Sequence, residues 1–216
     1  MIIKPGYQIA NSQNPDSDFG TLGGIVSDNM NRQILMTCFH CVFTNGMYWR
    51  DISANAGLAS VKIGEHNVFQ QNAGKIERLL RDERVDIALL EATDDNDLDL
   101  AIPVFGVTNG IGYLSDSDTG TWLRKYGAVS HDTYGQFVGF APFGFKYEEE
   151  AVPHQLENLI AIRTADGSNF SEKGDSGSFV MNDKNQVVGV IVTGDGPTSY
   201  AIQASIIVSR LKIKFI

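Results

Sequence analysis

Cysteine is nearly absent from this chain, which has only Cys38 and Cys41 among its 216 residues. Cysteines three positions apart cannot cross-link distant segments, so the stability of the fold has to come from packing. A Cys-x-x-Cys pair can also bind zinc or act in redox chemistry. The sequence, however, lacks a second ligand pair at zinc spacing and a thioredoxin-like βαβ pattern around the pair. We therefore expect two reduced, buried thiols and neither a metal nor a cofactor.

Long hydrophobic runs and an excess of positive charge are absent as well. No run of 18 apolar residues is present, and the first residues lack the charged-then-apolar pattern of a secretory signal. We therefore expect a cytoplasmic protein that does not associate with a membrane. The formal net charge is −9, with 17 Lys and Arg against 26 Asp and Glu. Phosphate binding needs clustered Lys and Arg, so this charge argues against a nucleic-acid partner.

Short apolar runs separated by turn signals recur along the chain. They are rich in β-branched residues, and long stretches with helical periodicity are nearly absent, so the pattern predicts an all-β fold. The predicted strands are Leu22–Val26, Ile34–Met36, Ile87–Leu90, Thr121–Tyr126, Gln136–Phe140, Leu159–Arg163, Phe179–Met181 and Val187–Thr193. Two helical segments are expected, a single turn within Ile76–Arg84 and a short terminal helix over Ala204–Leu211.

The chain divides near its midpoint. A polar stretch that contains glycine, Thr108–Gly120, falls between the two groups of predicted strands. We therefore expect two β-barrels, one over residues 1–110 and one over residues 111–216, which together form one functional domain.

Three short segments place chemically reactive side chains at the edges of apolar strands. They are Thr37–Cys41 around His40, Val85–Leu90 around Asp86, and Gly174–Ser178 around Ser176. A serine hydroxyl is a poor nucleophile near neutral pH. It needs an imidazole to accept its proton and a carboxylate to orient that imidazole and to stabilise the cation that forms. The glycines beside Ser176 allow a sharp turn that points the amides of Gly174 and Ser176 at one developing oxyanion.

Each of these residues also has a structural interpretation. His40 alone is as compatible with a hydrogen-bonded structural role as with catalysis, Asp86 alone is typical of a turn cap, and Gly-Asp-Ser-Gly can be a plain turn. Their combination is more informative, because the order His, Asp, Ser is not that of the α/β-hydrolases or the subtilisins. Ser178 also stands where the Gly-x-Ser-x-Gly elbow of the hydrolases would require glycine.

Three motifs together resemble the trypsin-like (chymotrypsin-fold) serine peptidase family over about Gly20–Leu211. Met36–Cys41 is similar to Leu-Thr-Ala-Ala-His-Cys, Asp86–Leu90 matches Asp-Ile-Ala-Leu-Leu, and Gly174–Gly177 matches the nucleophile loop. A looser resemblance, over Lys125–Gly135 and Asn169–Ser176, is to non-secreted bacterial and plant members of the family.

The resemblance implies two six-stranded antiparallel β-barrels, with His40 and Asp86 in the first and Ser176 in the second. It implies a serine endopeptidase that hydrolyses peptide bonds through an acyl-enzyme, without a cofactor. Its partner would be a protein or peptide substrate, whose backbone adds to the edge strand Ile191–Gly194. A non-catalytic module that keeps the fold to bind peptides or partner proteins is the alternative. Esterase action is a second alternative, although it is usually found on an α/β sheet.

The chain also departs from the family pattern. No Arg or Lys followed by Ile-Val-Gly-Gly stands near its start, so a newly released amino terminus that pairs with Asp175 is not evident. Asp175 must find another partner, and the enzyme is either constitutively formed or controlled by a regulatory protein. Phe170 stands where trypsin keeps an aspartate, so the pocket predicts a medium-sized or apolar side chain. The resemblance assigns its walls to Phe170, Ser171, Glu172, Val192, Thr193 and Gly194.

Overall fold

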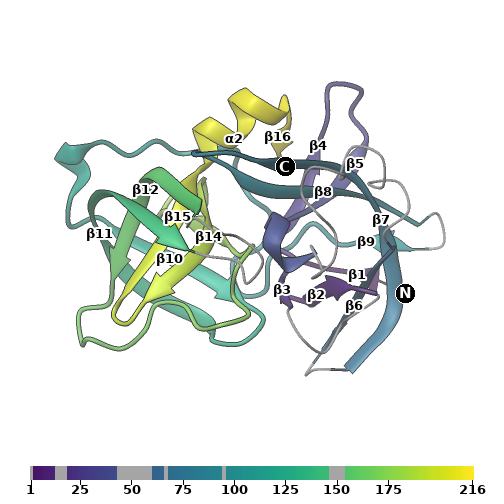
Figure 1. Cartoon of the computed structure of the whole chain (residues 1–216), viewed down its shortest axis with the longest axis horizontal. Helices are drawn as coiled ribbons and strands as arrows, with labels where there is room; N and C mark the ends of the chain where they lie inside the picture. The colour runs from purple at the N-terminus through teal and green to yellow at the C-terminus, as the bar shows by residue number, and fades with distance from the viewer. Residues whose placement is uncertain (1, 13–18, 43–59, 66–67, 94–95, 146–153) are drawn as a thin grey trace.

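The computed structural model describes residues 2–12, 19–42, 60–65, 68–93, 96–145 and 154–216. These residues form mostly β-strands, with a single α-helix, α2 (Ala204–Leu211), near the C-terminus. Figure 1 shows the strands in two groups that lie side by side. The all-β prediction and the short C-terminal helix are thereby confirmed. Among the described helices, none has the length and apolar character to cross a membrane.

The C-terminal group is a closed antiparallel barrel of six strands, as expected. Its strand order is β10-β11-β12-β15-β14-β13. The strands are β10 (Trp122–Gly127), β11 (His131–Phe145), β12 (His154–Arg163), β13 (Phe179–Met181), β14 (Val187–Asp195) and β15 (Thr198–Gln203). The barrel is filled by buried apolar side chains from all its strands and from the loop before Ser176, among them Leu123, Phe137, Ile160, Phe170, Val180, Ile191 and Ala201.

In the described residues, the N-terminal group is a sheet of eight strands, two more than the resemblance implies. Its order is β16-β4-β5-β8-β7-β6-β2-β3, and its pairs are antiparallel. The strands are β2 (Gln8–Asn11), β3 (Gly20–Thr21), β4 (Gly24–Ser27), β5 (Gln33–Thr37), β6 (Ser60–Glu65), β7 (Val68–Arg81), β8 (Asp86–Ala92) and β16 (Lys214–Phe215). A separate parallel pair joins β1 (Ile2–Ile3) to β9 (Asp97–Leu98).

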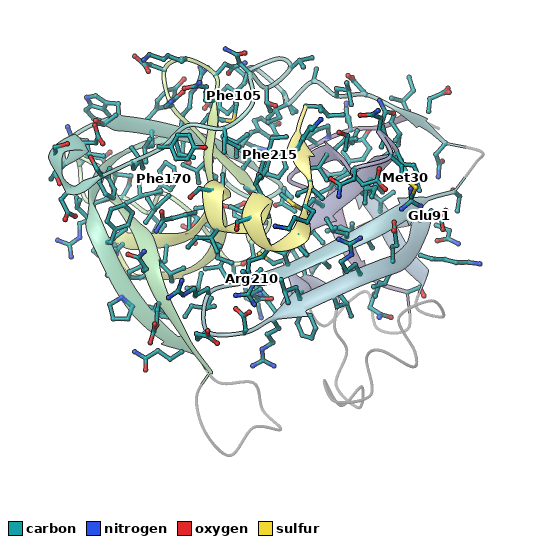
Figure 2. The ribbon with its side chains drawn as sticks, turned by 90° about the horizontal axis from the view of Figure 1, so that it is seen from above. Met30, Glu91, Phe105, Phe170, Arg210 and Phe215 are labelled. Carbon is teal, nitrogen blue, oxygen red and sulfur yellow. The ribbon has the colours of Figure 1, made fainter. Side chains whose placement is uncertain are left out.

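The end of the chain returns to this first sheet. β16 pairs with β4, and the Phe215 ring meets the Phe179 ring of the barrel edge-on at 5.0 Å between centroids. Helix α2, which comes just before β16, is tied to the first sheet by a hydrogen bond from the Arg78 guanidinium to the Leu211 carbonyl, at 2.7 Å. The helix and the last strand therefore connect the two halves (Figure 2).

The predicted helical turn over Ile76–Arg84 is wrong, because most of this segment belongs to strand β7. Ile76 pairs with Leu90 and Arg78 with Leu89, so Glu77 is an extra residue in the ladder. A β-bulge of this kind interrupts the two-residue alternation of a strand. The apolar positions on either side of the bulge then acquire a spacing that resembles one turn of a helix.

Glycine lets the two halves approach closely beside Ser176. The φ of Gly23 lies outside the left-handed region, so glycine is needed here for space. A Cβ on Gly23 would lie 2.0 Å from the Gly177 carbonyl oxygen and 2.6 Å from the Phe179 ring. The neighbouring amide of Thr21 donates to the Ser176 carbonyl at 2.7 Å. The first sheet thus meets the Ser176 loop backbone to backbone.

We expect Gly23→Ala to destabilise the protein by about 1–3 kcal/mol, because the added methyl group must displace the Gly177 carbonyl. Urea unfolding measures this loss. Gly194→Ala is the matched control, since its Cβ would make an ordinary contact at 3.5 Å. The control should change the free energy of unfolding by no more than about 0.5 kcal/mol. Equal stability of the two variants would contradict the close approach.

Candidate active site

His40 and Asp86 are brought together by the pairing of β5 with β8. Thr37 at the end of β5 pairs with Ala88, and the chain then makes a 3₁₀ turn over Phe39–Cys41 that turns His40 toward the start of β8. The imidazole Nδ1 lies 2.8 Å from Asp86 Oδ2, and the His40 amide donates to Asp86 Oδ1 at 3.1 Å. Two contacts to one carboxylate fix both the position and the orientation of the imidazole.

This contact also sets the charge state of the two groups. Burial lowers the pKa of His40, but the negative charges of Cys41 and Asp86 outweigh burial and hold that pKa well above its ordinary value. Burial acts to raise the pKa of Asp86, and the His40 cation and its hydrogen bonds bring the net pKa below the ordinary value. With Nδ1 donating to Asp86, Nε2 is the ring nitrogen that can accept a proton.

Ser176 lies beside this pair although it belongs to the other half. The Cys41 thiol, adjacent to His40, donates to the Ser176 carbonyl at 3.5 Å. The structure therefore brings the backbone of Ser176 next to the residue that follows His40. The Ser176 hydroxyl donates to the Val192 carbonyl at 3.1 Å. The Ser176 hydroxyl proton therefore has to leave the Val192 carbonyl before it can reach another acceptor.

Two backbone amides of the loop around Ser176 are left out of its hydrogen bonds. Gly174 and Gly177 have φ values of +103° and +99°, which favour glycine. The Gly174 carbonyl is directed to the Thr21 hydroxyl, which donates to it at 2.8 Å. Within the part of the chain that the structure describes, the amides of Gly174 and Ser176 have no protein acceptor. The binding of an oxyanion by these two amides stays a prediction.

The residues predicted to line the substrate pocket do not share one environment. Phe170 has no exposed surface and lies in the barrel core, whereas Thr193 is half-buried and Gly194 is exposed. The buried Ser171 hydroxyl donates to Ser199 Oγ at 2.8 Å, and a Cβ at Gly194 would lie 3.5 Å from Ser171 Oγ. Ser199, which the sequence does not reveal as a site residue, therefore joins Ser171 beside Gly194.

Val192 is buried, and its carbonyl accepts the Ser176 hydrogen bond described above. Residues 193–195 pair with β15 along one edge. In the described residues no strand pairs with the other edge of Val192–Gly194. The binding of an extended peptide at this edge stays a prediction.

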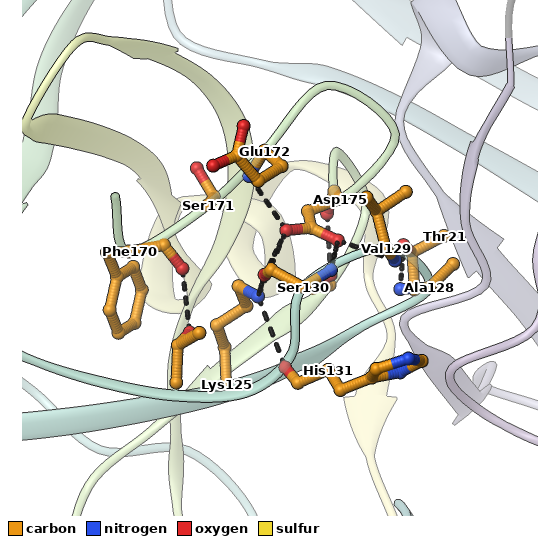
Figure 3. Close-up of polar contacts among 12 residues, drawn as sticks. Thr21, Lys125, Ala128, Val129, Ser130, His131, Phe170, Ser171, Glu172 and Asp175 are labelled. Atoms are coloured by element: carbon orange, nitrogen blue, oxygen red, sulfur yellow. Dashed lines mark hydrogen bonds and ion pairs between the residues drawn. The ribbon is translucent and has the colours of Figure 1, made fainter. Parts of the chain in front are cut away.

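The cation that faces Asp175 is Lys125, a residue that the sequence motifs do not single out. Its Nζ lies 3.1 Å from Asp175 Oδ2, and neither side chain has exposed surface. Figure 3 shows this pair within a group of hydrogen bonds that also includes Val129, Ser130 and Glu172. Asp175 thus has an internal partner in place of a released amino terminus.

The two cysteines are free and buried, as expected. Cys38 donates to the Ile191 carbonyl at 3.1 Å, and burial raises the pKa of its thiol. Burial also acts to raise the pKa of Cys41, but the hydrogen bond from Cys38 and the His40 cation lower it to about 6. In the described residues, His, Cys, Asp and Glu side chains form no group of three that could hold a metal ion.

The charges around His40 lead to a prediction that needs no assay of activity. In an NMR titration of wild-type protein, the His40 pKa should lie well above 6.5. Asp86→Asn should lower it, because the neutral amide no longer stabilises the imidazolium. Cys41→Ala should also lower it, and Asp118→Asn, in an exposed turn, should leave it unchanged. The same His40 pKa in wild type and Asp86→Asn would contradict the conclusion that the Asp86 carboxylate raises the pKa of His40.

No protein-family model and no curated protein sequence matches the chain. Solved structures with a similar fold do match it. The Nocardiopsis protease NAPase has 16% identity and a TM-score of 0.67, with 99% of this chain and 98% of that chain covered. Thermobifida fusca protease A has 16% identity and a TM-score of 0.67, with 100% and 99% covered. Cellulomonas bogoriensis chymotrypsin has 16% identity and a TM-score of 0.65, again with 100% and 99% covered. The chain therefore has the chymotrypsin-like fold of these serine proteases.

Proposed function

We propose that the chain is a serine endopeptidase with Ser176 as nucleophile, His40 as general base and Asp86 as the carboxylate that orients it. The observation that carries the proposal is the double contact of Asp86 with His40, at 2.8 and 3.1 Å, next to the Ser176 loop. A buried carboxylate on Nδ1 leaves Nε2 to take a proton, which is the function a serine nucleophile needs.

The reaction follows from these positions. The Ser176 hydroxyl leaves the Val192 carbonyl, gives its proton to His40 Nε2 and attacks the peptide carbonyl carbon. The amides of Gly174 and Ser176 stabilise the oxyanion that forms. His40 then gives its proton to the leaving amine, which breaks the C–N bond and leaves an acyl-enzyme. Water, activated by His40, hydrolyses the ester and restores the Ser176 hydroxyl.

Substrate selection in this proposal depends on the surroundings of Gly194. The heavy atoms nearest to a Cβ at Gly194 are Ser171 Oγ, the Thr198 carbonyl oxygen and Ser199 Oγ. These atoms carry no formal charge, and the two hydroxyls are bonded to each other. We therefore infer that an uncharged side chain of medium size precedes the bond that is cleaved. Phe170, buried beneath, acts on this side chain only through its neighbours.

One observation favours the alternative of a non-catalytic binding module. The Ser176 hydroxyl is bonded to the Val192 carbonyl, and that bond has to break before His40 can accept the proton. A protein that only binds peptides would keep this bond and still offer the edge of Val192–Gly194. Covalent labelling separates the two functions, because only an activated serine forms an adduct.

A fluorophosphonate probe should form an adduct on Ser176 of native protein, located by peptide mass spectrometry. Ser176→Ala should abolish the adduct and lower turnover of a peptide library by a factor on the order of 10⁶, while the fold is kept. Ser205→Ala, on helix α2, is the matched control and should label like wild type. Absence of an adduct on wild-type Ser176 would refute the endopeptidase proposal and favour the non-catalytic binding module.

Asp86→Asn should lower kcat by a factor on the order of 10⁴, because the imidazole then loses the carboxylate that holds its tautomer. The exposed Asp118→Asn variant should keep wild-type kcat. Wild-type activity should also fall as the pH drops through the raised pKa of His40, since a protonated imidazole cannot act as base. Unchanged kcat in Asp86→Asn would remove Asp86 from the mechanism.

A further inference from the structure

The Cys-x-x-Cys motif has no part in the proposed hydrolysis, although it lies beside the general base. Cys38 precedes the 3₁₀ turn Phe39–Cys41, and the Cys41 amide donates to the Cys38 carbonyl at 3.3 Å. A four-residue turn closed in this way keeps its first and last Cα atoms within about 7 Å of each other. A disulfide can join Cα atoms that are up to about 7 Å apart. The backbone therefore places the two cysteines at a separation that a disulfide can bridge.

The side chains of the two cysteines also meet. Both are free, and their thiols are hydrogen-bonded to each other. Each sulfur in addition contacts a carbonyl of the second half, that of Ile191 at 3.1 Å from Cys38 and that of Ser176 at 3.5 Å from Cys41. The pair therefore lies at the contact between the two halves, with each sulfur next to the other.

The two thiols differ in charge, which gives them different parts in an oxidation. Burial raises the pKa of Cys38, so this side chain is a neutral thiol. Burial also acts to raise the pKa of Cys41, but the hydrogen bond from Cys38 and the His40 cation lower it to about 6. Near neutral pH Cys41 is therefore a thiolate, which is the form of cysteine that attacks peroxides.

We propose that Cys41 and Cys38 are a peroxide-sensitive pair that forms a reversible disulfide beside His40. The Cys41 thiolate attacks one oxygen of hydrogen peroxide, the O–O bond breaks, and the leaving hydroxide takes a proton from His40 to become water. The Cys38 sulfur then attacks the sulfur of the Cys41 sulfenic acid. The S–O bond breaks, and the departing hydroxide takes the Cys38 proton and leaves as a second water. The two sulfurs are thereby oxidised and one peroxide is reduced to two waters.

Burial limits the oxidant to a molecule not much larger than water. Cys41 keeps 2% of its surface exposed and Cys38 none. The space around the Cys41 sulfur is also tight, because a Cβ on Gly20 would lie 2.1 Å from it. Hydrogen peroxide is larger than water by one oxygen atom. Oxidised glutathione, a disulfide of two tripeptides, is too large to approach this sulfur in the folded protein.

The contact between the two halves does not depend on the thiol protons that the disulfide removes. The Ser176 carbonyl also accepts from the Thr21 amide, at 2.7 Å. The Ile191 carbonyl also accepts from the Gly177 amide, at 2.7 Å. A thiol is a weak donor beside these amides. We therefore expect the oxidised protein to stay folded.

The disulfide removes a negative charge from beside His40. Burial lowers the pKa of His40, and the charges of Cys41 on the same turn and Asp86 on β8 outweigh burial. Arg81 on β7 is the cation that faces Asp86. Without the Cys41 thiolate the pKa of His40 should fall, so that the imidazole is neutral at lower pH. Where His40 is the general base, as proposed above, the oxidised protein then keeps its activity to lower pH than the reduced one.

The test treats folded wild-type protein with hydrogen peroxide and follows both thiols by non-reducing peptide mass spectrometry. The two thiol hydrogens should be lost, with a cross-link between Cys38 and Cys41 that dithiothreitol reverses. The rate should fall as the pH drops through about 6, where Cys41 becomes protonated, and oxidised glutathione should not react. Two free thiols after peroxide treatment would overturn the inference. Sulfinic acid on Cys41 beside a free Cys38, or a disulfide between two molecules, would overturn it as well.

Two matched variants assign the attacking and the second sulfur, because the chain has only these two cysteines. Cys38→Ala should stop at the Cys41 sulfenic acid, which dimedone traps. Cys41→Ala should leave Cys38 a free thiol at the same peroxide concentration, since burial keeps that thiol neutral. The reverse pattern would overturn the assignment of Cys41 as the attacking sulfur. The wild-type result decides on the disulfide itself even where a variant does not fold.

The effect on His40 is read by NMR titration of the reduced and the oxidised wild type. The His40 pKa should be lower in the oxidised protein, and equal values in the two forms would refute an effect on the base. This measurement and the mass measurement need no hydrolysis, so the disulfide stands or falls independently of the proposed function. Absence of peptide hydrolysis and of a Ser176 adduct in both forms is a different result, and it refutes the proposed function.

Discussion

The site depends on one close contact between the two halves of the chain. The Thr21 amide donates to the Ser176 carbonyl at 2.7 Å, and the thiol of Cys41 reaches the same oxygen at 3.5 Å. His40 and Asp86 belong to the first half and Ser176 to the second, so neither half holds all three residues of the proposed triad. Backbones can approach this closely only where side chains are missing, which explains why Gly20 and Gly23 lie at the contact.

Two carboxylates near Ser176, those of Asp86 and Asp175, are buried and need partners for their negative charge. Asp86 and Asp175 have no exposed surface, and each combines backbone amide donors with one cationic side chain. The partner of Asp86 is the His40 imidazole, the proposed general base. The partner of Asp175 is an ammonium group that stays in place. A buried carboxylate that lost its partner would be costly, so folding and the geometry of the site are coupled at both positions.

Local patterns in the sequence predicted most of the strands and the terminal helix, and short motifs singled out the three residues proposed as the triad, because alternation and short motifs record local constraints. The segment Ile76–Arg84 was misread because a bulge in β7 breaks alternation, and β16 was missed because a strand of two residues gains its pairing only from β4. Lys125 carried a readable signal. It occupies an inward position of an alternating strand, where a charge requires a buried partner, but only the fold identifies that partner as Asp175.

The source of the cation that pairs with Asp175 determines when the loop around Ser176 can take up its structure. An amino terminus released by cleavage is absent until the cleavage occurs, whereas Lys125 is delivered to Asp175 by the pairing of β10 with β11 and β13. The closed barrel therefore holds the ammonium group, the segment 128–130 and the Asp175 carboxylate next to one another. Of the two forms of control considered for this chain, an internal cation favours a constitutively formed site over one that waits for a regulatory protein.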